Sequence, residues 1–344
     1  MGKGISVIVC CYNSAKRLPE TLGHLIRQKI NGIDWEIIVV DNASTDSTAE
    51  VAKKILSDTA PSVNYKVIGE PEPGLINARN RGFANSSFEF VLFCDDDNWL
   101  SETYLQTAFN LMSSNLNMGI LGGCGEAVFE ESKPDWFDDC QINFAVGDQA
   151  PEQLNIDLLK LEHVYGAGFM IRRRLFDELE TGNFKSLLSG RKGNQLISGE
   201  DSELCWVAQQ LGYEIWYYRK LHFKHLMTKG RMKWSYIKKL YFGFGRANIY
   251  TQAYYHFNAN KGLPNFDLRL PFWLDTYVHK LKVLLLFLPR VLFHFREVGN
   301  KNVLKFYGMR GELYELWNLK EKYNEVFLNI MKMKQKLASM KRTV

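Results

Sequence analysis

The sequence predicts an α/β protein with a doubly wound, mainly parallel sheet and a helical, basic, apolar C-terminal extension. Three observations support this prediction. Continuous apolar runs alternate with helical patterns over residues 5–94, as in parallel strands that are buried on both faces. Polar side chains follow the ends of these runs. The charge is also divided, because residues 1–220 carry a net charge of −11 and residues 221–344 one of +16.

Composition excludes several classes of protein. The chain has 344 residues, of which 46% are hydrophobic and 24% are charged, so it is neither disordered, nor collagen-like, nor a polytopic membrane protein. Its six cysteines show no C-x-x-C pair and no zinc spacing, which predicts buried thiols in a reducing compartment, the cytoplasm.

The first part of the chain gives the clearest element pattern. Strands are expected at Ile5–Cys11, Glu36–Asp41, Tyr65–Ile68 and Phe88–Cys94. Helices are expected over Arg17–Lys29, from a capping box at Ser47 onward, and over Ile76–Ala84. Ligands of such sheets bind outside the carboxyl ends of the strands, where Asn13, Asp41 and Asp95 should therefore converge.

The middle of the chain is mixed. Strands are expected over Gly119–Phe129, Tyr165–Ile171 and Glu214–Tyr218. The polar stretch Glu130–Gln153 predicts a mobile loop that either closes over the donor or shapes the acceptor site. An S-x-x-D cap at Ser198 predicts a helix that ends at Gly212.

The chain divides into three expected parts: a strand-rich domain over 1–230, a basic apolar helical region over 231–310, and an amphipathic helix over 311–344. The apolar stretch Phe266–Phe295 is too interrupted by charge to span a bilayer. It predicts either an interfacial segment on anionic lipid or a helical hairpin packed on the domain. No nucleic-acid motif accompanies the basic charge.

Apolar residues of the tail recur at alternating spacings of three and four. They are Leu316, Leu319, Tyr323, Val326, Ile330, Met333, Leu337 and Met340. Such a seam is typical of a coiled coil and predicts a homo-oligomer through 311–344. The alternative is an amphipathic helix that docks on its own domain or lies on lipid.

Three carboxylates, Asp95, Asp96 and Asp97, directly follow a buried strand. They repel one another unless a cation neutralises them, and hard divalent cations prefer oxygen ligands. In an extended segment Asp95 and Asp97 point the same way and Asp96 points oppositely. We therefore expect Asp95 and Asp97 to hold Mn²⁺ or Mg²⁺ near a phosphate-bearing ligand.

Five motifs in order resemble the family 2 glycosyltransferases. They are Val7–Asn13, Val39–Asp46, Gly74 with Ala78–Gly82, Phe93–Asp97 and Gly199–Asp201, and the resemblance covers about residues 4–245. It implies the A-type nucleotide-sugar transferase fold and inverting chemistry. The chain departs from the family at Cys10-Cys11, where a Pro-containing pair is usual, and at Asn42, where a second acid is usual.

The resemblance also implies donor-binding residues. Tyr12 and Asn13 match positions beside the nucleotide base, Asp41 one that hydrogen-bonds uracil, and Arg79 one near the base and diphosphate. Asp95 and Asp97 match the aspartates that hold ribose and the metal, and Asp96 joins the donor-binding set. Gly168 would let the backbone approach the donor sugar, although it equally suits tight packing.

Asp201 matches the general base of the family, with Glu200 as the weaker candidate. An acceptor hydroxyl must lose its proton as it attacks, and a positioned carboxylate can take that proton. His225 resembles an occasional third metal ligand, with His222 as its competitor, and Arg231 could clamp the leaving diphosphate. Trp136 and Trp206 could stack on sugar, but core packing is the commoner fate of a tryptophan.

The predicted function is transfer of a sugar from a nucleotide diphospho-sugar, expected to be a UDP-sugar, to an acceptor hydroxyl in surface polysaccharide or glycolipid synthesis. The acceptor is a sugar or is lipid-linked, and the enzyme is expected at the inner face of the cell membrane. The alternatives are a sugar nucleotidyltransferase, which should carry a Gly-rich basic loop after its first strand, and a non-catalytic, membrane-tethered nucleotide-binding scaffold.

Overall fold

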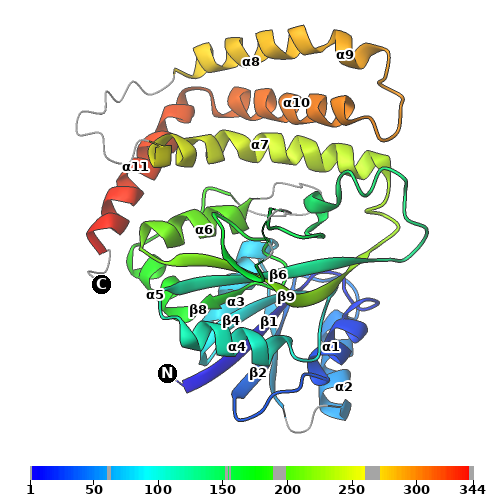
Figure 1. The fold of residues 1–344 in the computed structure, drawn as a ribbon, viewed down its shortest axis with the longest axis vertical. Coiled ribbons are helices and arrows are strands. Elements are labelled where there is room, and N and C mark those ends of the chain that lie inside the picture. The colour runs from blue at the N-terminus through cyan, green and yellow to red at the C-terminus, as the bar shows by residue number, and fades with distance from the viewer. Residues whose placement is uncertain are drawn as a thin grey trace.

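A central sheet with stacked helices above it forms the protein (Figure 1). The structure is a computed structural model that describes residues 2–59, 63–151, 154, 156–188, 199–259 and 272–340. The strands are β1 (Gly2–Cys11), β2 (Asp34–Asn42), β3 (Asn64–Glu70), β4 (Phe88–Asp95), β5 (Asn98–Leu100), β6 (Met118–Phe129), β7 (Leu158–Lys160), β8 (Met170–Arg172) and β9 (Glu214–Met227). The α-helices are α1 (Leu18–Ile26), α2 (Thr48–Thr59), α3 (Leu75–Ala84), α4 (Tyr104–Ser114), α5 (Arg173–Thr181), α6 (Glu200–Gln210), α7 (Trp234–Ala259), α8 (Trp273–Phe287), α9 (Pro289–Leu292), α10 (Lys301–Leu319) and α11 (Tyr323–Met340).

The sheet has the order β3-β2-β1-β4-β8-β6-β9-β5, with β7 added on β9. β1 to β4 run parallel to one another, as their continuous apolar sequences predict. β8 is antiparallel to both of its neighbours, and β6 and β9 pair in parallel. Ile5, Val7 and Ile8 of β1 are fully buried, which places this strand in the core between helices on both faces.

Two expectations about the middle of the chain were wrong. The strand expected over Tyr165–Ile171 is only Met170–Arg172, because the preceding residues form a loop at the carboxyl edge of the sheet. The expected mobile loop over Glu130–Gln153 is largely ordered by its own aromatic residues. Trp136 and Phe144 are buried in a cluster that includes Trp234 at the start of α7. Trp136 does not line the cavity and has the core role that was its alternative.

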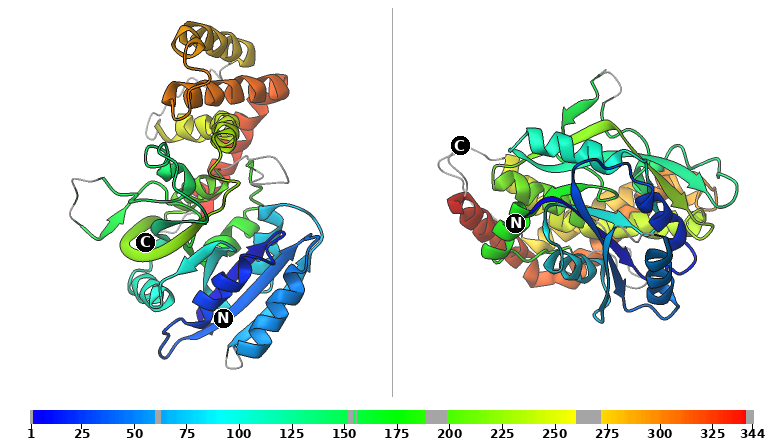
Figure 2. Two further views of the ribbon diagram at one scale, coloured as in Figure 1. Left: turned by 90° about the vertical axis from the view of Figure 1, so that its right-hand side faces the viewer. Right: turned by 90° about the horizontal axis from the view of Figure 1, so that it is seen from below.

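Helices α7, α10 and α8 lie in successive layers above the sheet (Figures 1 and 2). α7 and α10 approach closely because glycines line their contact. A Cβ on Gly245 would lie 1.9 Å from the carbonyl oxygen of Gly308, and one on Gly311 would lie 2.0 Å from that of Phe242. The glycines therefore fix how α10 is placed over α7.

The heptad pattern of the tail closes on the chain itself, which corrects the expectation of a homo-oligomer through 311–344. Leu316 at the end of α10 and Tyr323, Phe327 and Ile330 of α11 are buried in the same core cluster as Trp206 of α6. Most of the predicted seam is thus already used within one chain. The expected boundary at residue 311 falls inside α10, and Trp206 has the core role that was its alternative.

The predicted apolar stretch Phe266–Phe295 is described from residue 272 onward; its first residues, and Ser198, lie outside the described part of the chain. Its main element is α8, which has 15 residues. Within the described residues, no helix is both long and apolar enough to cross a bilayer.

Candidate active site

A cavity of about 1300 Å³ lies at the carboxyl ends of the strands, between the sheet and helices α7 and α10. It brings together most of the predicted site residues. Its lining includes Tyr12, Arg79, Asp95, Asp96, Asp97, Glu200, Asp201, His225 and Arg231. These residues are far apart in the sequence, from Tyr12 to Arg231. They meet because the carboxyl ends of parallel strands lie at one edge of the sheet, where ligands bind.

Asp97, His225 and Arg231 form one polar group. β5 pairs with β9 so that Asn98 lies opposite His225, and the amide of Leu226 donates to the carbonyl oxygen of Asp97 at 2.9 Å. Nη1 of Arg231 donates to Oδ2 of Asp97 and lies 2.9 Å both from that oxygen and from Nε2 of His225. The same nitrogen of His225 lies 3.4 Å from Oδ1 of Asp97.

Strand alternation decides between the two candidate histidines. His225 is buried and faces the cavity, whereas His222 lies on the opposite face of β9 and is exposed. Arg231 is held next to its carboxylate partner. Burial acts to lower the pKa of Arg231, but the charge of Asp97 raises that pKa above its ordinary value.

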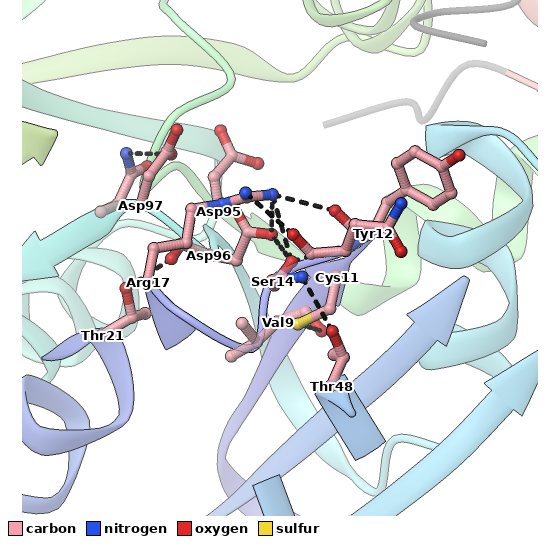
Figure 3. A network of polar contacts seen from close by, with 12 residues as sticks. Val9, Cys11, Tyr12, Ser14, Arg17, Thr21, Thr48, Asp95, Asp96 and Asp97 are labelled. Atoms are coloured by element: carbon pink, nitrogen blue, oxygen red, sulfur yellow. Dashed lines mark hydrogen bonds and ion pairs between the residues drawn. The ribbon is translucent and has the colours of Figure 1, made fainter. Parts of the chain in front are cut away.

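Asp96 points away from Asp95 and Asp97, into the loop between β1 and α1 (Figure 3). Nε and Nη2 of Arg17 donate to its two carboxylate oxygens, each at 2.7 Å, and the hydroxyl of Ser14 also donates to it. Burial raises the pKa of Asp96, and Arg17 opposes this effect. Its carboxylate is thus used within the protein, so Asp96 shapes the loop rather than presenting a free acid to a donor.

Arg17 is a site residue that the sequence analysis missed. Besides Asp96 it holds the carbonyl oxygens of Tyr12 and Asn13, so it fixes the backbone where the predicted base-binding residues lie. The signal was available, because Arg17 follows the first strand by one short turn and the acidic triplet needs a cation.

At the base end of the site, the predicted residues differ in exposure. Tyr12 is half exposed and lines the cavity. Asn13 has a φ of 51° and accepts a hydrogen bond from the amide of Thr45 with its side-chain oxygen. Asn13 and Asp41 do not belong to the cavity lining, but Oδ1 of Asp41 is buried with no hydrogen-bond partner in the described structure.

Asn42 explains its own departure from the family pattern. Its amide nitrogen donates to the carbonyl oxygens of Glu70 and Glu72, and its amide oxygen accepts from the amide of Gly74. A carboxylate cannot donate to the two carbonyls. Asn42 therefore ties the end of β2 to the loop that leads into α3.

Arg79 of α3 is nearly buried at the cavity wall. Its guanidinium lies over the rings of Phe93 and Phe169, 5.3 and 5.5 Å from their centroids. These aromatic faces support the charged group where it borders the cavity.

Asp201 lies in the first turn of α6 and faces the cavity. Its Oδ2 accepts from the amide of Gly166 at 2.9 Å and its Oδ1 from the amide of Ser202 at 2.8 Å. A Cβ on Gly166 would lie 3.1 Å from the Cβ of Asp201, so a glycine lets this loop reach the acid. Gly168, predicted as a donor-binding residue, does not line the cavity; its carbonyl oxygen accepts from the hydroxyl of Tyr104.

The opposite wall of the cavity comes from α7 and α10 and was not predicted. Lys305, Met309 and Glu312 of α10 lie there beside Tyr241 and Asn248 of α7. Local sequence gives no signal for this wall, because it exists only once α10 packs on α7.

The carboxylates of Asp95 and Asp97 suit a hard divalent cation such as Mn²⁺ or Mg²⁺, which prefers oxygen ligands. Among the described residues, however, no three histidine, cysteine, aspartate or glutamate side chains are close enough to hold a metal ion together. In this arrangement Arg231 neutralises Asp97. The two aspartates fit a metal that also binds phosphate oxygens, and His225 can join only where Arg231 gives up its contact.

Comparison with known proteins agrees with this geometry. Residues 6–180 match the profile of the family described as glycosyl transferase family 2. The chain is 30% identical over 138 residues to the poly(ribitol-phosphate) beta-N-acetylglucosaminyltransferase TarS of Staphylococcus aureus. This match covers 38% of this chain and 24% of that protein. It is 32% identical over 108 residues to the cholesterol galactosyltransferase of Borreliella burgdorferi, and this match covers 31% of this chain and 28% of that protein. The matched part is thus about a quarter of each relative.

Solved structures extend the likeness to the fold of the chain. A mannosyltransferase from Pyrobaculum calidifontis, in complex with GDP-Man and Mn²⁺, matches with a TM-score of 0.58 and 17% identity, over 92% of this chain and 88% of that chain. Residues 1–349 of S. aureus TarS in complex with UDP match with a TM-score of 0.50 and 17% identity, over 96% of this chain and 91% of that chain. The fold is therefore the predicted A-type fold with a C-terminal helical region.

Proposed function

Because the chain belongs to glycosyl transferase family 2, we propose that it transfers a sugar from a UDP-sugar to an acceptor hydroxyl, with inversion at the anomeric carbon. The observation that supports this most is the shared cavity. Asp95, Asp97 and Asp201 all line it. In this proposal Asp95 and Asp97 serve the donor side of the cavity and Asp201 serves the acceptor.

The donor lies along the carboxyl ends of β1, β2 and β4 in this proposal. Tyr12 borders the base and the unpartnered oxygen of Asp41 accepts a hydrogen bond from it. Arg79 and Arg231 supply positive charge beside the diphosphate. Asp95 and Asp97 would hold Mn²⁺ or Mg²⁺, and the ion would supply positive charge for the leaving nucleoside diphosphate.

Asp201 accepts the proton of the acceptor hydroxyl as that oxygen attacks the anomeric carbon. The amides of Gly166 and Ser202 fix the orientation of its carboxylate toward the cavity. Glu200 lies beside it and is the alternative base. The acceptor enters between α7, α10 and Asp201, because the acidic triplet lies on the other side.

The relatives suggest a class of acceptor. TarS is named for the transfer of N-acetylglucosamine to poly(ribitol-phosphate). We propose that the acceptor here is a hydroxyl of a surface polymer or of a lipid-linked glycan, and that the enzyme acts in the cytoplasm as a peripheral protein at the inner face of the cell membrane.

A donor screen tests the proposal. Purified full-length protein is incubated with UDP-, GDP- and dTDP-sugars, and released nucleoside diphosphate is measured with and without EDTA. We expect UDP release that EDTA abolishes and Mn²⁺ restores. Release of pyrophosphate would identify a nucleotidyltransferase, and calorimetry without UDP binding in the presence of Mn²⁺ would favour a non-catalytic scaffold.

A further inference from the structure

Helices α8 and α9 form the outermost layer of the molecule, on the side of α10 that faces away from the sheet (Figures 1 and 2). Large apolar side chains are exposed there. We call this surface the α8–α9 face; its exposed apolar residues are Leu274, Val278, Leu285, Leu286, Leu292 and Phe293. Leu286 is 72% exposed and Phe293 is 91% exposed, values that an ordinary soluble surface rarely shows side by side.

One side of α8 packs on α10, where the ring of Tyr277 contacts that of Trp317 and Lys280 pairs with Glu312. Leu274, Val278 and Leu285 recur at helical spacing away from this contact, next to the exposed polar residues Asp275, His279 and Lys282. α8 is thus amphipathic in part, and the described residues leave these apolar side chains uncovered.

Basic side chains lie among the exposed apolar ones. Lys282, Arg290 and Arg296 are exposed on this segment, and residues 221–344 together carry a net charge of +16. The fitting occupant is therefore apolar and anionic. A second copy of the chain would bring the same positive charges to a symmetric contact and would be repelled.

The length of α8 decides whether this helix would span a bilayer or lie on its surface. Its 15 residues are fewer than the ~20 that a spanning helix needs. A helix of this kind lies in the plane of a bilayer, with aliphatic side chains among the acyl chains and Lys and Arg at the lipid phosphates.

We propose that the α8–α9 face docks on an anionic lipid bilayer. This inference rests on the peripheral location in the proposed function and gives that location a defined surface. Leu285, Leu286 and Phe293 enter the headgroup boundary, while Lys282 and Arg290 meet lipid phosphates.

The docked orientation brings the cavity near the membrane. Glu312 of α10 lines the cavity and pairs with Lys280 of α8, so one helix layer, about 10 Å thick, separates the acceptor wall from the docking face.

Co-sedimentation of the full-length protein with vesicles tests the inference. One set of vesicles is phosphatidylcholine alone, and the other contains phosphatidylglycerol at an equal ratio. We expect binding to the anionic vesicles only, at least tenfold weaker for Leu286→Gln/Phe293→Ser and for Lys282→Glu/Arg290→Glu. The substituted side chains are exposed, so the fold is retained.

The chain offers matched controls. Leu116 is 71% exposed in the turn between α4 and β6, so Leu116→Gln should bind vesicles like the wild type. Lys53 and Lys54 are exposed on α2, and their reversal to Glu should also leave binding unchanged.

Three outcomes overturn the docking inference: equal binding to neutral vesicles, equal weakening by the control variants, or no binding by the wild type. Sedimentation velocity that shows a dimer abolished by Leu286→Gln would assign the face to a second copy instead. UDP release is measured on the same variants without vesicles. Normal release with no vesicle binding rejects the docking face alone, whereas absent release in the wild type rejects the proposed function.

Discussion

Asn42 shows at the scale of one residue why an amide replaces an acid at the end of β2. Its amide nitrogen donates to the carbonyl oxygens of Glu70 and Glu72, on the way from β3 to α3, and its oxygen accepts from the amide of Gly74. The side chain is buried, so water cannot substitute for these bonds. The departure from the family pattern at Asn42 thus organises the wall of the site.

Asn42→Asp should therefore destabilise the protein. It removes both donors and places a negative charge against two carbonyl oxygens, with an expected loss of about 1–3 kcal/mol in the free energy of unfolding. Urea denaturation gives the value. Asn77→Asp is the control, because its amide makes only long, exposed contacts of 3.4 Å to the same loop and should cost less than about 0.5 kcal/mol. Equal losses in the free energy of unfolding for the two variants would show that the hydrogen bonds of Asn42 do not stabilise the protein more than those of Asn77.

The two acids at the start of α6 can be separated by isosteric amides. Asp201→Asn keeps an oxygen for the amide of Gly166 but cannot take a proton, so kcat should fall by about 10²–10⁴-fold with UDP affinity unchanged. Glu200→Gln should lose less than about tenfold, within the range expected for a neighbour that transfers no proton. Steady-state kinetics and calorimetry measure both. The reverse ranking would move the base to Glu200.

Single residues were predictable from sequence where they stand at strand ends. Asp95, Asp97 and Asp201 do meet at one cavity. Asp96 points the other way as expected, although Asp96 and Asp97 lie in the turn between β4 and β5 and not in a strand. Arg17 was missed, since its role depends on a contact with residues about 80 positions away in the chain. Gly168 was placed in the site by pattern alone, whereas packing against Tyr104 accounts for it.

At the scale of elements, the crossing of α7 and α10 is the contact that builds the acceptor wall. Their glycines allow backbone carbonyls of one helix to touch the Cα positions of the other. A side chain there would push α10 outward and would open the cavity on that side.

Gly311→Ala should be destabilising despite the better helix propensity of alanine. The added Cβ would lie 2.0 Å from the carbonyl oxygen of Phe242, so overpacking should cost about 1–3 kcal/mol or more. Gly308→Ala is the matched control on the same helix. Its Cβ would lie 3.6 Å from the nearest atom, and the protein should be as stable as the wild type or gain up to about 1 kcal/mol. Thermal unfolding of both variants decides, and a stable Gly311→Ala would contradict the close crossing.

Periodicity identified β1 to β4 because a strand buried on both faces has an unbroken apolar sequence. The same reasoning made β8 too long. Tyr165–Gly168 form a loop instead, in which the amide of Gly166 donates to the carboxylate of Asp201. This reasoning also took a stretch with buried Trp136 and Phe144 for a mobile loop, because their partner Trp234 is distant in sequence. Long-range packing is what local patterns do not contain.

At the scale of the whole molecule, the C-terminal helices belong to the structure that holds the active site. α11 packs on α6, whose first turn carries Asp201, and on α7. The seam of the tail was read correctly as an amphipathic stripe, but sequence could not say whether its partner is another chain or the same one.

Phe327→Ala tests this integration. Phe327 is 2% exposed in the core that α11 shares with α6, so its truncation should cost about 3–5 kcal/mol and lower the single unfolding transition of the entire protein. Leu328 is its neighbour on the outer side of α11 and is 36% exposed; Leu328→Ala should change stability by less than about 0.5 kcal/mol. A separate early transition in Phe327→Ala would mean that the tail is an independent unit.

The burial of α11 against α6 also sets an order of events during synthesis. The ribosome releases α6 more than a hundred residues before it releases Tyr323, which is about ten seconds at the usual ~5–20 residues per second. For that interval the nascent sheet exists while the apolar side of α6 around Trp206 is open. The apolar side of α6 is therefore covered only after the C-terminal helices have been synthesised.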